Sequence, residues 1–99
     1  MNVIITEAAY DDLLQIGRTI KHDNPVRAES FVAVLFDRCQ SLGDMPRAYP
    51  LLDHWANKDI RKRVYGNYLI FYRSYKETIE VLHILHGATN YEPMLFPEG

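Results

Sequence analysis

The sequence predicts an α+β fold in which a hairpin of two helices packs on a small, mainly antiparallel sheet. Three observations support it: a short β-branched run comes first, two stretches with helical spacing of apolar residues follow, and the last third alternates as strands do. The expected order is β-α-α-β-β-β, and a length of 99 residues favours one domain over residues 1–99. Helices on one face of so small a sheet would leave its other face partly open.

The first part of the chain predicts a strand followed by a helix. Residues 2–6 contain the β-branched run Val3-Ile4-Ile5, which favours a strand. Thr6 is a good helix cap, and Glu7 places negative charge at a helix start, where the helix dipole stabilises it. Helical spacing of apolar residues extends this helix over about residues 7–21. These residues are Tyr10, Leu13, Leu14, Gly17 and Ile20.

A second helix is predicted to begin at Asn24-Pro25, because asparagine caps helices well and proline fits the first turn. Its apolar positions continue to Leu42, and Gly43 is placed to end it. Residues 43–57 have turn chemistry without a clean period, which predicts an ordered loop packing apolar side chains onto the helices. The side chains expected to pack are Met45, Tyr49, Leu51, Leu52 and Trp55.

The last third predicts three strands, at residues 60–65, 68–75 and 78–85, joined by tight turns into an antiparallel meander. Alternation divides the side chains of each strand between two faces. In the first strand, one face carries Arg61, Arg63 and Tyr65, and the other carries Ile60, Lys62 and Val64. In the second, one face carries Leu69, Phe71 and Arg73, and the other carries Tyr68, Ile70 and Tyr72. Which of these faces meet is left open.

Several classes of protein lack a signature here. The single cysteine, Cys39, excludes an internal disulfide, and no signal-peptide pattern or membrane-length apolar run is present, so a cytoplasmic protein is expected. There is no glycine-rich phosphate loop and no zinc motif, so neither a cofactor nor a metal is expected. His83 and His86 lie three apart on a strand and therefore face opposite sides.

Charge is distributed unevenly along the chain. The net charge is −2, but residues 58–76 carry six basic residues and one acidic residue. This segment also holds four of the seven tyrosines. A basic, tyrosine-rich segment in an acidic chain indicates a surface directed at a partner, because tyrosine and arginine are common at the energetic centres of interfaces. The alternative is a solvated strand face whose tyrosines pack in the core.

The same segment holds the residue types of a metal-free ribonuclease. Such a site needs a general acid and base together with cations that stabilise the developing charge. The candidates are Arg61, Arg63, Arg73 and His86, with Tyr65 beside them. The alternative is that the tyrosines pack and the arginines cover the rim of the sheet.

Two stretches resemble the ParE branch of the RelE/ParE toxin superfamily. One is Ile60-Arg61-Lys62-Arg63-Val64-Tyr65-Gly66-Asn67-Tyr68-Leu69-Ile70-Phe71-Tyr72-Arg73, and the other runs from Ile79 through Leu85-His86-Gly87-Ala88. The Asn24-Pro25 helix break and Met45-Pro46 after the second helix are also similar to this family. The resemblance spans nearly the whole chain and implies the RelE/ParE fold.

The resemblance also implies a function. ParE proteins are toxins of type II toxin–antitoxin systems that poison DNA gyrase and arrest growth. A ParD-like antitoxin wraps the toxin in a hetero-oligomer and binds operator DNA, so DNA contact is only indirect. Nuclease members of the superfamily carry an arginine where this chain has Leu69, so a non-enzymatic inhibitor is favoured over a RelE-like ribosome-dependent mRNA endonuclease. ParE sequences commonly continue with Arg-Asp where this chain has Thr89-Asn90. A degenerate, non-toxic binding partner is the third possibility.

Two sets of binding residues are predicted. The surface that contacts the target is expected to include Arg61, Arg63, Tyr65, Arg73 and His86. The antitoxin is expected to use the helix hairpin and an open sheet edge by strand addition. Its hairpin contacts are predicted near Leu13, Leu14, Ile20, Phe31 and Leu35.

Overall fold

The computed structural model describes residues 1–52 and 59–95, and it confirms the predicted order of elements. Strand β1 is followed by a pair of helices, and then by three strands and one further helical turn. The bounds are β1 Asn2–Ile5, α1 Glu7–Asp23, α2 Pro25–Gln40, the 3-10 turn η1 Ser41–Gly43, β2 Ile60–Tyr65, β3 Tyr68–Tyr75, β4 Thr78–His86 and α3 Glu92–Leu95.

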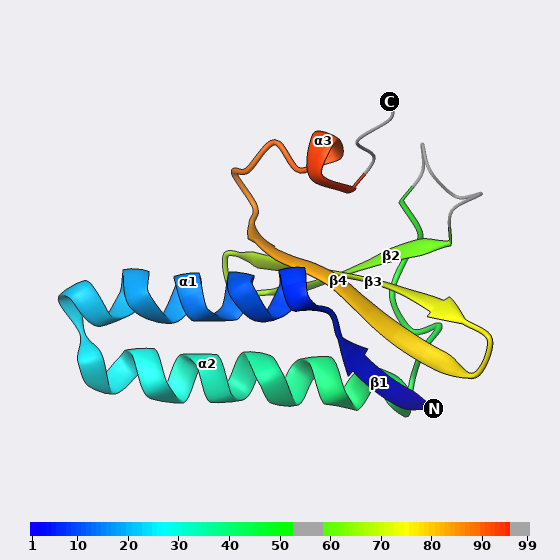
Figure 1. The fold of residues 1–99 in the computed structure, drawn as a ribbon, viewed down its shortest axis with the longest axis horizontal. Helices are drawn as coiled ribbons and strands as arrows, with labels where there is room; N and C mark the ends of the chain where they lie inside the picture. Colours follow the sequence, from blue (N-terminus) through cyan, green and yellow to red (C-terminus); the bar gives the residue numbers. More distant parts are fainter. Residues whose placement is uncertain (53–58, 96–99) are drawn as a thin grey trace.

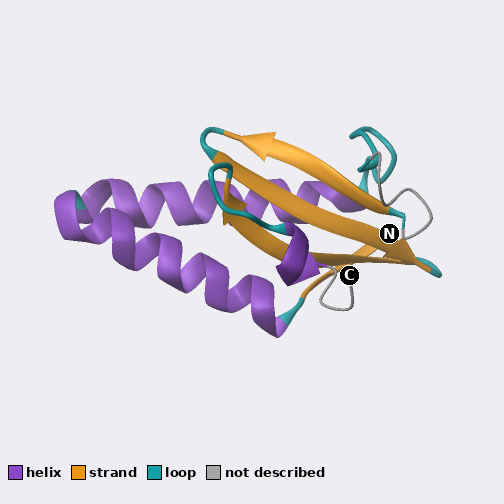
Figure 2. Ribbon diagram, turned by 90° about the horizontal axis from the view of Figure 1, so that it is seen from above, coloured by secondary structure: helices purple, strands orange, loops and turns teal. Residues whose placement is uncertain are grey.

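The four strands form one sheet in the order β1-β4-β3-β2. β2, β3 and β4 are an antiparallel meander, whereas β1 pairs with β4 in parallel. The α1–α2 hairpin covers one side of this sheet, here called the helix side, and α3 lies on the other, here called the outer side (Figure 1). Seen from above, the strands lie over the hairpin, and the tip of the hairpin projects past them (Figure 2).

Capping explains where the two long helices begin. The Thr6 hydroxyl accepts a hydrogen bond from the Ala9 amide at 3.2 Å, and the Asn24 side chain accepts one from the Arg27 amide at 3.1 Å. Pro25 occupies the first turn of α2, as predicted. The ends differ slightly from expectation: α1 continues to Asp23, and α2 ends at Gln40, after which the 3-10 turn η1 extends to Gly43.

The main core lies between the hairpin and the helix side of the sheet. Its fully buried side chains include Leu35, Cys39 and Leu42 from the helices, facing Ile79 and Tyr72 from the strands. Burial raises the pKa of the Cys39 thiol to about 12, an effect that the charge of Arg63 opposes, so this thiol stays protonated at neutral pH. Burial also raises the pKa of the Tyr72 hydroxyl, which donates a hydrogen bond to the Pro46 carbonyl at 3.0 Å.

A second, smaller core lies on the outer side, where the sequence predicted a partly open face. Ile60, Phe71 and Leu85 are buried there beneath Tyr91 and Leu95 of the C-terminal segment. The ring centroids of Tyr91 and Phe71 are 4.7 Å apart. The chain thus turns back and covers the apolar residues of the outer face in this region, whereas Val64 on the same face is 61% exposed, so the face is partly open as predicted.

The prediction that the loop at residues 43–57 packs onto the helices is partly wrong, because part of this loop packs against the outer core. Tyr49 packs against the main core as expected. Leu52 packs against the outer core instead of the helices. Trp55 lies outside the described residues.

Gly43 ties the end of the hairpin to the first strand, and its replacement by alanine is expected to destabilise the protein by about 2 kcal/mol. An added Cβ would overlap the carbonyl oxygen of Met1 and lie 3.1 Å from Cγ2 of Val3, so β1 would have to move. The amino group of Met1 also donates to the Gly43 carbonyl at 2.9 Å. Urea unfolding measures the change. Gly87→Ala is the matched control, since its Cβ meets Asn67 at an ordinary 3.5 Å, and equal losses in both variants would contradict this account.

Candidate functional site

Strand register places four of the five predicted target-binding residues on the helix side of the sheet. Arg61 lies opposite Tyr72, and Arg63 lies opposite Ile70, both of which belong to the main core. Tyr65 lies opposite Tyr68, which in turn pairs with His86 of β4. The register therefore places Arg61, Arg63, Tyr65 and His86 on the same face of the sheet.

Arg73 lies on the other face, and its placement corrects the expectation that it joins these residues. Its strand neighbours are Ile60 and Glu80. Its Nε donates to the Glu80 carboxylate at 2.9 Å, and both side chains are partly exposed. The four residues considered for a nuclease are therefore divided between two sides of the sheet. On the outer side, Arg73 of β3 forms an ion pair with Glu80 of the neighbouring strand β4. This ion pair contributes little to stability, because water screens the two charges.

Arg61 and Arg63 are held in place by uncharged oxygen atoms. Nη1 of Arg61 donates to the Tyr49 carbonyl at 2.7 Å, and Nη1 of Arg63 donates to the Arg38 carbonyl and to the Ser41 hydroxyl at 2.9 and 2.8 Å. The Arg63 contact lies at the C-terminus of α2, where a cation is favourable. No carboxylate of residues 1–52 or 59–95 forms an ion pair with either arginine, so their charge is free to attract an anionic partner.

Aromatic rings continue from these arginines toward the end of β4. The Phe31 centroid lies 5.6 Å from those of both Tyr65 and Tyr68, and Tyr68 meets His86 edge-on at 5.4 Å. The Arg38 guanidinium lies 5.5 Å from the Tyr65 ring. Tyr65 and Tyr68 are half-buried: each packs against the main core and leaves part of its side chain at the surface. We call Arg38, Arg61, Arg63, Tyr65, Tyr68 and His86 the basic–aromatic row.

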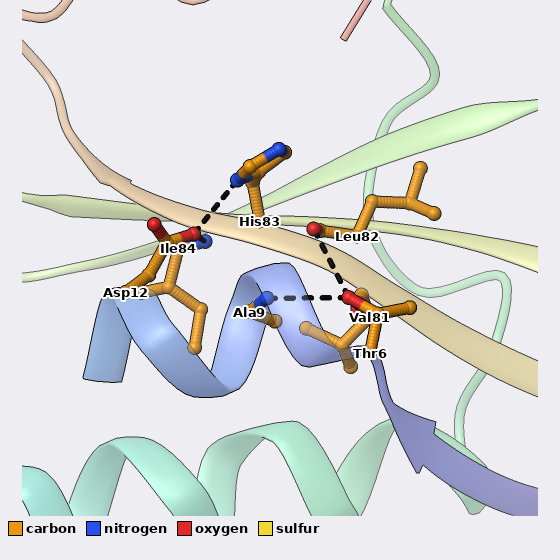
Figure 3. A network of polar contacts seen from close by, with 7 residues as sticks. All are labelled: Thr6, Ala9, Asp12, Val81, Leu82, His83 and Ile84. Carbon is orange, nitrogen blue, oxygen red and sulfur yellow. Dashed lines mark hydrogen bonds and ion pairs between the residues drawn. The ribbon is translucent and has the colours of Figure 1, made fainter. Parts of the chain in front are cut away.

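A second polar group lies at the edge of β4, where the pairing with β1 ends at Val81 (Figure 3). The Thr6 amide and hydroxyl donate to the Val81 carbonyl at 3.2 and 2.7 Å. Further along the edge, Oδ2 of Asp12 accepts from the Ile84 amide at 2.9 Å and lies 2.8 Å from Nδ1 of His83. Thr6 and the side chain of Asp12 thus replace the missing strand partner.

The contact between Asp12 and β4 was not predicted from the sequence. Asp12 lies near the start of α1, where the helix dipole stabilises a carboxylate whether or not it has a partner. Its position one residue before Leu13, on the core-facing side of α1, was the available signal. Arg38, Tyr49 and Ser41 were likewise not predicted as partners of the strand arginines, because they come from segments distant in the sequence.

The predicted antitoxin-binding residues of the hairpin separate into two groups. Leu13 and Leu35 are only 4% and 0% exposed, so they are core residues and present no surface to a partner; this corrects the prediction. Leu14 is 52% exposed, and Ile20 and Phe31 are half-buried. Tyr10, one turn before Leu14, is also exposed. Surface on the hairpin is thus provided by Leu14 and its neighbours.

The described residues contain no group of three histidine, cysteine or acidic side chains arranged to hold a metal ion. His83 and His86 lie on opposite faces of the sheet, as predicted, because their strand partners are Phe71 and Tyr68. None of the helices in the described part of the chain is both long enough and apolar enough to cross a membrane. The surface features that remain are the basic–aromatic row, the exposed hairpin residues and the free strand edges.

Comparison with known proteins gives consistent matches for sequence and fold. Residues 3–91 match the family described as "ParE toxin of type II toxin-antitoxin system, parDE". The structure is similar to a solved chain described as "Chromosomal ParDE TA system from P. aeruginosa", with a TM-score of 0.66. The two sequences are 17% identical, and the alignment covers 87% of this chain and 95% of that one. A search of curated protein sequences finds no match.

Proposed function

Because the chain belongs to the ParE toxin family of type II toxin–antitoxin systems, we propose that it arrests growth by inhibiting DNA gyrase and that a ParD-like antitoxin neutralises it. The family match over residues 3–91 is the observation that carries this proposal. The chain would act in the cytoplasm, in a hetero-oligomer with its antitoxin, and would meet operator DNA only through that antitoxin.

A non-enzymatic mode of action is favoured over mRNA cleavage. The position at which nuclease members carry an arginine is Leu69, which packs against the outer core. Arg73 is also on the outer side, paired with Glu80, and so does not add its charge to Arg61, Arg63 and His86. A cleavage site needs its acid, base and cations to converge on one phosphate. A RelE-like endonuclease remains the second candidate, because Arg61, Arg63 and His86 do share a face.

We assign target contact to the basic–aromatic row and antitoxin contact to the exposed hairpin residues near Leu14, Ile20 and Phe31. The row combines free positive charge with half-buried tyrosines, a composition typical of interface centres. The hairpin residues offer aliphatic and aromatic surface beside it. Arg73 is not assigned to the target surface, since it faces the other way.

A supercoiling assay with purified gyrase tests the target. The wild-type toxin is expected to inhibit supercoiling, and Arg63→Gln is expected to inhibit it roughly tenfold less well, because glutamine is polar but carries no charge. Arg73→Gln is the matched control on the outer side and is expected to inhibit like the wild type. Unaltered supercoiling with the wild-type toxin, together with codon-phased mRNA cuts in cells that express it, would favour the endonuclease instead.

A further inference from the structure

Pro50 stops the protein from completing its own pairing along the outer edge of β2. Leu51 and Arg61 form an antiparallel bridge, in which the Leu52 amide donates to the Ile60 carbonyl at 2.9 Å and the Lys62 amide donates to the Pro50 carbonyl at 3.1 Å. The next bond of this ladder would run from the amide of residue 50 to the Lys62 carbonyl. Proline has no N–H, so that bond cannot form and the pairing ends there.

The strand beyond this point has an open edge. Successive residues of a strand direct their backbone groups to opposite edges, so Val64 points its N–H and C=O the same way as Ile60 and Lys62, away from β3. Within the described ranges, the Val64 backbone has no partner on that edge. Its side chain is 61% exposed. An edge with free donors and acceptors is a template for another strand.

The basic side chains along this edge favour pairing with an acidic strand over pairing with a basic one. Lys62 and Val64 present their side chains on the outer side, and Arg61 and Arg63 present theirs on the helix side with Arg38 nearby. A second copy of β2 would place these cations against one another, which is unfavourable for strand pairing. A segment with alternating carboxylates meets them favourably.

We propose that the edge of β2 from Lys62 to Val64 takes an extended acidic segment of the antitoxin by strand addition. The segment accepts a hydrogen bond from the Val64 amide and donates one to the Val64 carbonyl. Its carboxylates lie near Arg63 and Arg38 on the helix side, and its apolar side chain lies beside Val64 on the outer side. This inference rests on the proposed function, since it assumes that an antitoxin binds.

The variant Val64→Pro tests the backbone contact directly. It removes an amide hydrogen that points away from β3, so the native ladder stays intact, and proline is tolerated at such an edge position. Binding of the antitoxin encoded beside this gene, measured by calorimetry, is expected to weaken roughly tenfold or more. Val64→Ala is the control: it keeps the amide and shortens the side chain, and its affinity is expected to fall by only about threefold.

The outcomes separate this inference from the proposed function. If Val64→Pro binds like the wild type, strand addition at β2 is wrong although the toxin still has its antitoxin. If the wild type itself binds no antitoxin, the proposed function is wrong, and the strand-addition inference that rests on it is wrong as well. If the free toxin forms dimers that Val64→Pro abolishes, the edge serves a second copy and the acidic segment is wrong.

A second measurement covers the case in which Val64→Pro fails to fold. Hydrogen exchange of the wild-type protein reports the Val64 amide directly. Slower exchange of this amide in the antitoxin complex than in the free toxin is expected. An unchanged exchange rate overturns the inference.

Discussion

Replacing Leu35 with alanine will lower the free energy of unfolding by about 2–5 kcal/mol. Leu35 is completely buried in the main core, where helix α2 meets the sheet, so the truncation leaves a cavity that its neighbours cannot fill. A loss of this size is a large part of the stability of a small domain. Urea unfolding followed by circular dichroism measures it, and toxicity in cells is expected to fall with it.

Leu14→Ala is the matched control on the same hairpin. Its side chain is half exposed, so the expected change in unfolding free energy is within about 0.5 kcal/mol, whereas antitoxin binding is expected to weaken. Comparison of Leu35→Ala with Leu14→Ala therefore distinguishes a core residue from a residue of the contact surface. Loss of antitoxin binding in a Leu35→Ala protein that unfolds at the same urea concentration as wild type would show that our assignment of Leu35 to the core is wrong.

The second large effect is expected from Asp12→Ala, at about 2–3 kcal/mol of unfolding free energy. Oδ2 of Asp12 serves both the Ile84 amide and His83, and its carboxylate is only 17% exposed. Removing it leaves a backbone donor of β4 without its partner at the point where β1 no longer covers the strand. Chemical denaturation and the exchange rate of the Ile84 amide measure the effect together.

Two further variants identify the cause. Asp11→Ala changes the neighbouring exposed carboxylate and is expected to alter stability by less than about 0.5 kcal/mol. Asp12→Asn keeps an oxygen that can accept from Ile84 and is expected to recover part of the loss. Equal losses in Asp11→Ala and Asp12→Ala would indicate an effect of helix charge rather than the contact with β4.

Local features of the sequence predicted the elements well. The caps at Thr6 and Asn24 and the period of apolar residues in each helix and strand act within a few residues, so they can be read without knowing the fold. The same alternation grouped Arg61 with Arg63 and grouped Arg73 with Leu69 and Phe71, but only the strand register shows that these two groups lie on opposite sides of the sheet.

What the sequence did not predict depends on contacts between distant segments. Helical spacing gives an apolar stripe but not which of its residues the sheet covers, so Leu13 and Leu35 could not be told apart from Leu14 by spacing alone. The C-terminal cover of the outer side was missed because a four-residue helix such as α3 has almost no periodic signal. Asp12 was missed for a similar reason: its partners lie 71 and 72 residues away.

The parallel pairing of β1 with β4 has a consequence for synthesis. Among the described strands, β1 pairs with β4 alone, at residues 78–81, which leave the ribosome long after β1. Contacts of such long sequence separation form late and slowly. The two helices can assemble while the chain is still growing, but the sheet that presents the basic–aromatic row cannot close until β4 has emerged. A nascent or truncated chain lacking β4 is therefore expected to lack the basic–aromatic row as an assembled surface.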